Sequence, residues 1–193
     1  MNEVEMNKQT KLSPHFTLGE LTKTSYHPLG GNIPSHEAIE NLKRICGWLE
    51  ILRERYNRKY GQAGVTREGQ SPCNSPVCDE AAHRGDSPCV SLDIPVVINS
   101  GYRSEEVNRM CGGAKGSNHL TGCAVDIKCL GPEQMIRYAC ILLDTADEKS
   151  HEGDDHYCEN FDELILEKRG TTYWIHFAVR PKDNRRKILF DCR

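Results

Sequence analysis

The sequence predicts an α+β fold: a small, mainly antiparallel sheet with helices packed on it. Two segments, 33–61 and 131–146, carry apolar residues at the three-to-four spacing of an amphipathic helix. Five shorter apolar or alternating segments are typical of strands: 94–103, 123–128, 162–168, 173–179 and 187–190. The order of these helices and strands indicates an α+β class.

The segment 33–61 gives the clearest helix. Ser35 is the expected N-cap and Gly61 the expected end. An apolar stripe at helical spacing is formed by Ala38, Ile39, Leu42, Ile45, Leu49 and Leu52. Before it, residues 12–25 are expected to form a short docking segment, in which Thr17 caps a helical turn containing Glu20.

Two further helices follow. Residues 104–113 are expected to form a short helix with Ser104 as its cap and glycines at its end. In 131–146, Pro132 occupies the first turn. The side chains expected to face inward are Met135, Ile136, Ala139, Leu142 and Leu143.

The strand segments are expected to present polar groups on one face of the sheet. In 123–128, Ala124, Asp126 and Lys128 share one face, while Val125 and Ile127 take the other. The segments 162–168 and 173–179 surround "RGTT", which is consistent with a hairpin, and 187–190 is expected to be a last edge strand.

The 193 residues suggest a single domain. We expect a disordered leader at 1–11, then one domain over 12–193 with an inserted loop at 61–92, a stretch rich in Gly, Ser, Pro and Cys. The net charge of -3 provides no overall basic field for nucleic acid, and we expect a monomer. No apolar run approaches the roughly 18 residues of a membrane span. The N-terminus lacks the apolar core of a signal peptide, so we expect synthesis in the cytoplasm.

Ten cysteines are expected to be mostly buried thiols, because no export signal favours a disulfide framework. Cys46 and Cys140 occupy apolar positions of predicted helices, and Cys123 and Cys129 flank a predicted strand. The inserted loop offers four soft ligands for a second, structural zinc ion: Cys73, Cys78, His83 and Cys89. Their spacing is not a common finger pattern, and one disulfide or free thiols are equally compatible with it.

The stretch "GSNHLTGCAVDIKC", 116–129, places an aspartate inside an apolar strand. An unpaired buried carboxylate is costly, so Asp126 is expected to have a cation or metal partner. Histidine nitrogen and carboxylate oxygen are zinc ligands, and His119 precedes Asp126 in a loop. His176 is the only other histidine in a strongly apolar strand, and two strands of one sheet can bring it beside Asp126. A hydrogen-bonded core histidine and a turn-capping aspartate would explain the same residues.

Several motifs in order strengthen the metal hypothesis. "SGYRS" at 100–104, S-x-H-x-x-G-x-A-x-D at 117–126 and W-x-H at 174–176 resemble the zinc D-Ala-D-Ala carboxypeptidases and related peptidoglycan endopeptidases, most closely their short bacterial and phage branch. The resemblance covers nearly the whole chain except 61–92. It implies a hedgehog/DD-peptidase-like fold and one catalytic Zn²⁺ held by His119, Asp126 and His176.

The same resemblance implies roles for neighbouring residues. Arg103 matches an arginine that binds substrate and stabilises the developing oxyanion, although a solvated loop arginine is the plain alternative. Ser117 is expected to contact substrate or orient its loop, and otherwise is a turn serine. Trp174 stands where some relatives have a second histidine, and with Tyr173 it is expected to contact substrate.

A general base is required to take a proton from water and pass it to the leaving amine. In some relatives an acid lies three residues before the last ligand, but here that residue is Tyr173. The preceding strand, "ELILEK", supplies Glu167 as the first candidate, with Glu163 and Asp162 as lesser ones. Exposed strand glutamates with no catalytic role are the alternative.

The sequence therefore predicts a zinc metallopeptidase that hydrolyses peptidoglycan stem or cross-link peptides. It would be a D-Ala-D-Ala carboxypeptidase or an endolysin-type endopeptidase, acting on the cell wall after phage-type release. The alternative is a non-enzymatic zinc-binding or cell-wall-binding module on the same fold. The sequence leaves the choice between carboxypeptidase and endopeptidase open.

Overall fold

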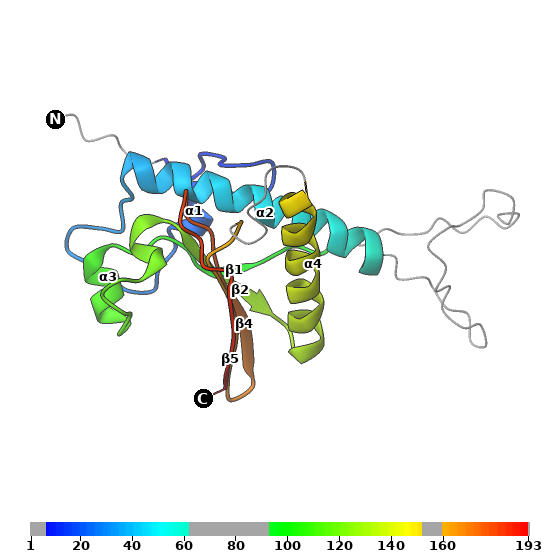
Figure 1. Cartoon of the computed structure of the whole chain (residues 1–193). Helices are drawn as coiled ribbons and strands as arrows, with labels where there is room; N and C mark the ends of the chain where they lie inside the picture. The colour runs from blue at the N-terminus through cyan, green and yellow to red at the C-terminus, as the bar shows by residue number, and fades with distance from the viewer. Residues whose placement is uncertain (1–6, 62–92, 152–159, 193) are drawn as a thin grey trace, which may run out of the picture.

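The computed structural model describes residues 7–61, 93–151 and 160–192. The described elements, in chain order, are α1 (Leu18–Leu21), α2 (His36–Tyr60), β1 (Ile98–Ser100), α3 (Glu105–Met110), the 3-10 helix η1 (Asn118–Thr121), β2 (Ala124–Cys129), α4 (Pro132–His151), β3 (Glu163–Arg169), β4 (Thr172–Ala178) and β5 (Lys187–Cys192). Figure 1 views the sheet nearly edge-on, with α4 on one side and α3 on the other.

The strands form a mixed, mostly antiparallel sheet in the order β1-β2-β4-β3-β5. All neighbouring pairs are antiparallel except β3 and β5. The predicted hairpin is β3–β4, and Gly170 in its turn has a φ of 60°, which suits glycine. The predicted α+β class is confirmed, and the last predicted strand is β5, at the sheet edge.

Helix α2 forms as its sequence predicts. The Ser35 side chain accepts a hydrogen bond from the Ala38 amide, and Gly61 is the C-cap. The predicted stripe is buried except for Ile39, which is half-buried. It packs on one face of the sheet, where the Trp48 and Phe177 rings lie 5.3 Å apart. This face is the hydrophobic core, so polar strand residues must take the other face.

The N-terminal segment docks through α1. Thr17 and Glu20 form a capping box, as the sequence predicts for the cap, and Leu18 and Leu21 are buried. Residues 7–11 lie beside α1, where the Thr10 and Lys8 carbonyls accept hydrogen bonds from the Leu18 and Gly19 amides. Residues 1–6 of the predicted leader and 62–92 of the predicted inserted loop lie outside the described residues.

In helix α4, two of the five side chains predicted to face inward are not buried. Ile136, predicted to face inward, is 53% exposed, and Leu143 is only half-buried. The buried side chains follow one helical stripe: Met135, Tyr138, Ala139, Ile141, Leu142 and Ala146. Ile136 lies one residue, or about 100°, beyond Met135 around the helix, so it points away from the sheet.

Within 94–103, where the sequence predicts a buried strand that ends at a glycine, β1 covers only Ile98–Ser100. It ends directly before Gly101 as predicted, but it begins later, and Val97 is 45% exposed. The chain leaves the sheet at Gly101 to pack against α1. A Cβ at Gly101 would lie 2.3 Å from the Leu21 carbonyl oxygen, and the Tyr102 amide donates to that same oxygen at 2.7 Å. This close approach requires glycine and ends the strand.

The cysteine prediction is confirmed only in part. Within the described residues, Cys46, Cys123 and Cys129 are buried free thiols, whereas Cys140 and Cys192 are exposed. Cys73, Cys78, His83 and Cys89, the possible second zinc site, lie outside the described residues. None of the described helices is both long enough and apolar enough to cross a membrane.

Candidate metal centre

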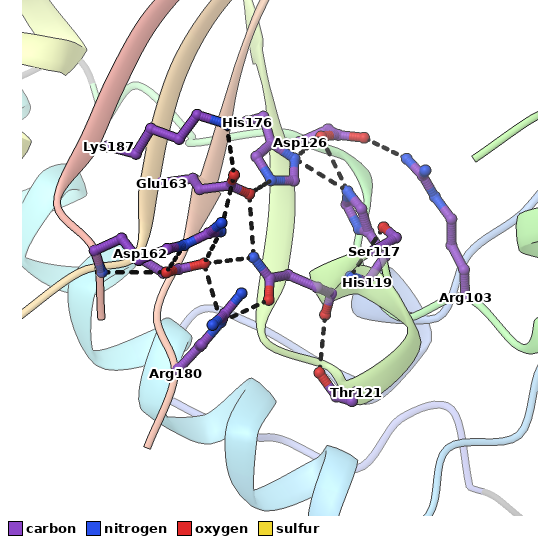
Figure 2. Close-up of polar contacts among 12 residues, drawn as sticks. Arg103, Ser117, His119, Thr121, Asp126, Asp162, Glu163, His176, Arg180 and Lys187 are labelled. Atoms are coloured by element: carbon purple, nitrogen blue, oxygen red, sulfur yellow. Dashed lines mark hydrogen bonds and ion pairs between the residues drawn. The ribbon is translucent and has the colours of Figure 1, made fainter. Parts of the chain in front are cut away.

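Three predicted ligands meet on the face of the sheet opposite the core. Asp126 on β2 and His176 on β4 are direct cross-strand partners. His119 reaches them from η1, the short 3-10 helix that precedes β2. Their side chains are buried or nearly so, with exposed fractions of 3% for His119 and 12% for the other two. Figure 2 shows the three side chains pointing toward one another.

The donor atoms are spaced as a zinc shell requires. His119 Nε2 lies 3.2 Å from His176 Nδ1 and 3.3 Å from Asp126 Oδ1, and His176 Nδ1 lies 3.1 Å from Asp126 Oδ1. Tetrahedral zinc with bonds of about 2.0–2.2 Å holds its ligand atoms about 3.3 Å apart. Two imidazole nitrogens and one carboxylate oxygen are also a common catalytic zinc set. The group therefore fits one zinc ion.

The second nitrogen of His119 is fixed by the backbone. Nδ1 lies 2.6 Å from the Gly101 carbonyl oxygen and donates its proton to it, which leaves the Nε2 lone pair for a metal. Gly122 fixes the other side of η1. Its φ is 70°, and a Cβ there would lie 2.4 Å from the Ala38 carbonyl oxygen, so η1 sits directly on α2. The conformation explains the glycine in the motif.

Arg103 holds the outer oxygen of Asp126. Its Nη2 donates to Asp126 Oδ2 at 2.5 Å, and its Nε donates to Ser100 Oγ at 2.8 Å. The arginine side chain is only 18% exposed, so it is not a solvated loop arginine. Burial alone would raise the pKa of Asp126, but attraction and hydrogen bonds from His119 and His176 outweigh it and hold that pKa well below its ordinary value.

Glu163 lies behind His176 and completes its orientation. His176 Nε2 is 3.5 Å from Glu163 Oε2, while Nδ1 faces the other two ligands. The His176 interaction lowers the pKa of Glu163 to about 2. Burial lowers the pKa of His176, yet its hydrogen bonds to Asp126 and Glu163 prevail and raise it to about 9. A carboxylate behind a ligating histidine is the usual outer support of a zinc site.

Glu167 stands on the same sheet face, on the other side of Ile165. Because side chains alternate along a strand, Glu163, Ile165 and Glu167 all face the cavity, which has a volume of about 560 Å³. Burial and the nearby Asp126 charge raise the pKa of Glu167 above its ordinary value. Glu167 is therefore a partly buried carboxyl group whose neutral form is favoured more than it is in water.

Residues 73–152 match a family model described as Peptidase M15. The chain carries a Peptidase M15 domain. This family belongs with the zinc D-Ala-D-Ala carboxypeptidases and the hedgehog-like peptidases. The M15 segment, 80 of the 193 residues, and the His-Asp-His group together indicate a zinc metallopeptidase. No curated protein matches the chain.

The matched range of the M15 domain contains Arg103, His119 and Asp126 but ends before His176. It begins within the segment 61–92, which the sequence suggested as an insertion. The third ligand is supplied by strand pairing, since β4 lies beside β2 in the sheet. The fold therefore completes a site that the matched segment contains only in part.

Two other predicted residues line the cavity of the M15 domain, and one does not. Ser117 is the N-cap of η1 and Trp174 precedes His176 on the same face of β4, and both border the cavity. Tyr173 points to the opposite face, where it packs against the hydrophobic core. The structure does not bring Tyr173 to the site, because neighbouring strand residues face opposite sides.

Asp162, one of the two lesser base candidates, is fully buried in an ion-pair network. Both of its oxygens accept hydrogen bonds from Arg185, each at 2.7 Å, and Asn118 Nδ2 donates to Oδ2, also at 2.7 Å. Arg180 Nε lies 3.0 Å from the same oxygen. These contacts tie the loop after β4 to η1 and to the start of β3 (Figure 2). Asp162 has the setting of a structural carboxylate.

The sequence did not single out Asn118, Arg180 or Arg185, although all three border the cavity. Asn118 was the unspecified position between the serine and the histidine of the motif. The two arginines belong to "VRPKDNRRK", a polar loop with no periodic pattern. What distinguishes them from other loop arginines is their contact with Asp162 and Glu163 in the folded chain, and no local sequence pattern predicts that contact.

Proposed function

We propose that this protein is a zinc-dependent peptidase that hydrolyses peptides of peptidoglycan, either stem peptides or their cross-links. The observation that carries the proposal is the convergence of His119, Asp126 and His176 in the wall of a cavity that also presents Glu167. Non-catalytic zinc sites are usually closed by four protein ligands, whereas catalytic sites have three and an open position. Three such ligands are present among the described residues.

Zinc bound there would polarise the scissile carbonyl and lower the pKa of a water molecule toward about 7. The chain supplies the proton carrier. Glu167, whose pKa is raised by burial and by Asp126, accepts the proton of the attacking water and then donates it to the leaving amine. Glu163 is less suited to this role because His176, Arg185 and Lys187 stabilise its ionised form.

Arg103 orients one ligand and faces the substrate. With Nη2 it holds Asp126 Oδ2, so that Oδ1 is turned toward the histidines. The same guanidinium borders the cavity and is placed to stabilise negative charge that develops on the carbonyl oxygen. Trp174 offers an aromatic surface at the other wall for the peptide chain.

The test is incubation of the zinc-loaded protein with purified muropeptides, analysed by chromatography and mass spectrometry. Released D-Ala identifies a carboxypeptidase, and cleaved cross-links or shortened stems identify an endopeptidase. His176→Ala should show no cleavage. Stoichiometric zinc with no cleavage of any muropeptide would overturn the enzymatic proposal and favour a binding module.

A further inference from the structure

The cavity has a second charged wall, on the side of Glu163 away from Asp126. It is formed by Arg180 and Arg185, which both lie between β4 and β5. Asp162 and Glu163 are the two carboxylates among them. Lys187, outside the cavity lining, is a further cation 3.4 Å from Glu163 Oε1. Arginine side chains at the edge of a cavity can attract an anionic ligand through donors that no carboxylate occupies.

The arginines of this wall are held rigidly. Asp162, whose side chain is 0% exposed, accepts two hydrogen bonds from Arg185. One comes from Nε and one from Nη2, each at 2.7 Å. Arg185 Nη2 also lies 3.0 Å from Glu163 Oε1. The Asn118 side chain accepts from Arg180 Nε at 3.1 Å through Oδ1 and donates to both carboxylates through Nδ2. A guanidinium positioned in this way loses little freedom when it binds a ligand.

Arg180 retains unused donors. The hydrogen bond of its side chain goes through Nε, and its two terminal nitrogens donate no hydrogen bond to the described part of the chain. The side chain is 32% exposed and borders the cavity. Arg103 differs, because its Nη2 already holds Asp126. Of these two arginines, Arg180 has the pair of terminal nitrogens that a planar anion can engage.

We propose that Arg180, supported by Arg185, binds a carboxylate of the substrate peptide. This inference rests on the proposed peptidase function and specifies one chemical feature of the substrate. A carboxylate fits because its two oxygens match the parallel N–H groups of a guanidinium.

The position of Arg180 indicates where the carboxylate lies along the peptide. Asn118 joins Arg180 to Glu163, and Glu163 contacts the ligand His176. Only a few side chains therefore separate this subsite from the metal ligands. The bound carboxylate therefore belongs to a part of the peptide near the scissile bond.

The test uses one stem-type peptide in three forms: with all carboxylates free, with the C-terminal carboxylate amidated, and with the α-carboxylate of its γ-linked glutamate amidated. Cleavage rates are measured for the zinc-loaded wild type, Arg180→Gln, Arg180→Lys and the control Lys182→Gln. Lys182 lies in the same loop, is exposed and is not part of the cavity wall, so its variant removes an equal charge elsewhere. Equilibrium binding to Glu167→Gln, with and without Arg180→Gln, gives a readout independent of cleavage.

In the wild type, amidation of the recognised carboxylate should lower kcat/KM and affinity by about tenfold or more, the usual effect of losing a charge-assisted hydrogen bond. Arg180→Gln should lower kcat/KM and affinity for the unmodified peptide by the same factor. Amidation of the recognised carboxylate should cause no further loss in this variant. Arg180→Lys should recover part of the loss seen in Arg180→Gln, and Lys182→Gln should behave as wild type. The responsive amide identifies which carboxylate is bound.

Equal losses on all three peptides in Arg180→Gln would overturn the proposal and leave a purely structural role. Equal handling of all three peptides by the wild type would also overturn it. A third outcome separates the two proposals. If the wild type cleaves no peptide, but Glu167→Gln binds the free and amidated peptides differently and Arg180→Gln removes that difference, the carboxylate subsite is supported. The proposed catalytic function is then wrong.

Discussion

Asp126 and His176 are directly opposite each other on β2 and β4, with Asp126 Oδ1 and His176 Nδ1 3.1 Å apart. Two of the three ligands are thus set by strand register and not by a loop. A shift of one residue in this pairing would turn one of the side chains toward the core. The buried partners on the other face, Val125, Ile127, Ile175 and Phe177, oppose such a shift. The same packing that stabilises the fold therefore maintains the metal geometry.

Replacement of His176 by alanine should abolish stoichiometric zinc binding. Removing one of three protein ligands lowers the affinity by more than about 100-fold, beyond the effect of losing an outer support. The measurement is zinc content after dialysis together with competition against a chromogenic chelator. His27→Ala is the matched control, because His27 is exposed and distant from the three ligands in the chain. Full zinc retention in His176→Ala would contradict the assigned ligand set.

The sequence predicts most of what depends on local periodicity. Alternation along the strand placed Asp126 on the face opposite Val125 and Ile127, and the structure confirms it. By the same rule Tyr173 belongs on the core face, opposite Trp174 and His176, and the structure places it there. Contacts that join distant segments were beyond local patterns. The Arg103–Asp126 pair and the Arg185–Asp162 pair arise from loops whose paths only the complete fold determines.

Substitutions of the two strand glutamates should separate catalysis from metal support. Glu167→Gln should lower kcat by about 10²–10⁴-fold while leaving zinc binding intact, because it removes the proton acceptor and keeps the shape. Glu163→Gln should lower zinc affinity by about tenfold or more, because it weakens the carboxylate behind His176. Steady-state kinetics at saturating zinc, with zinc titrations of both variants, provide the comparison. The reverse pattern would make Glu163 the base.

A methyl group at Gly122 should destabilise the protein and disturb His119. The new Cβ would meet the Ala38 carbonyl oxygen at 2.4 Å, at a φ of 70° that L-residues rarely adopt. A cost of about 1–3 kcal/mol is expected from the backbone conformation alone. Gly47→Ala is the control, since nothing lies within 4 Å of its Cβ in the helix α2, and it should stabilise by up to about 1 kcal/mol. Urea unfolding measures both, and a neutral Gly122→Ala would show that η1 can move away from α2.

Asp162 should stabilise the fold in a pH-dependent way. Burial alone would raise its pKa, but hydrogen bonds from Arg185 and Asn118 and attraction from Arg180 lower it below the ordinary value. A lowered folded-state pKa means that the unfolded chain binds the proton more readily. The stabilisation is therefore fully present above the unfolded pKa of about 3.9 and is lost as the pH falls through the folded value.

The variant Asp162→Asn isolates this contribution from the other carboxylates. At pH 7 it should lower the free energy of unfolding by roughly 2 kcal/mol, below the usual cost of breaking a buried pair because Arg185 is half-exposed. Urea unfolding of the variant and the wild type from pH 7 to pH 3 gives the difference at each pH. That difference should be constant down to about pH 5 and then shrink, since acid neutralises only the wild-type carboxylate at this position. A difference that stays constant to pH 3 would show that the ionised form of Asp162 is not what stabilises the network.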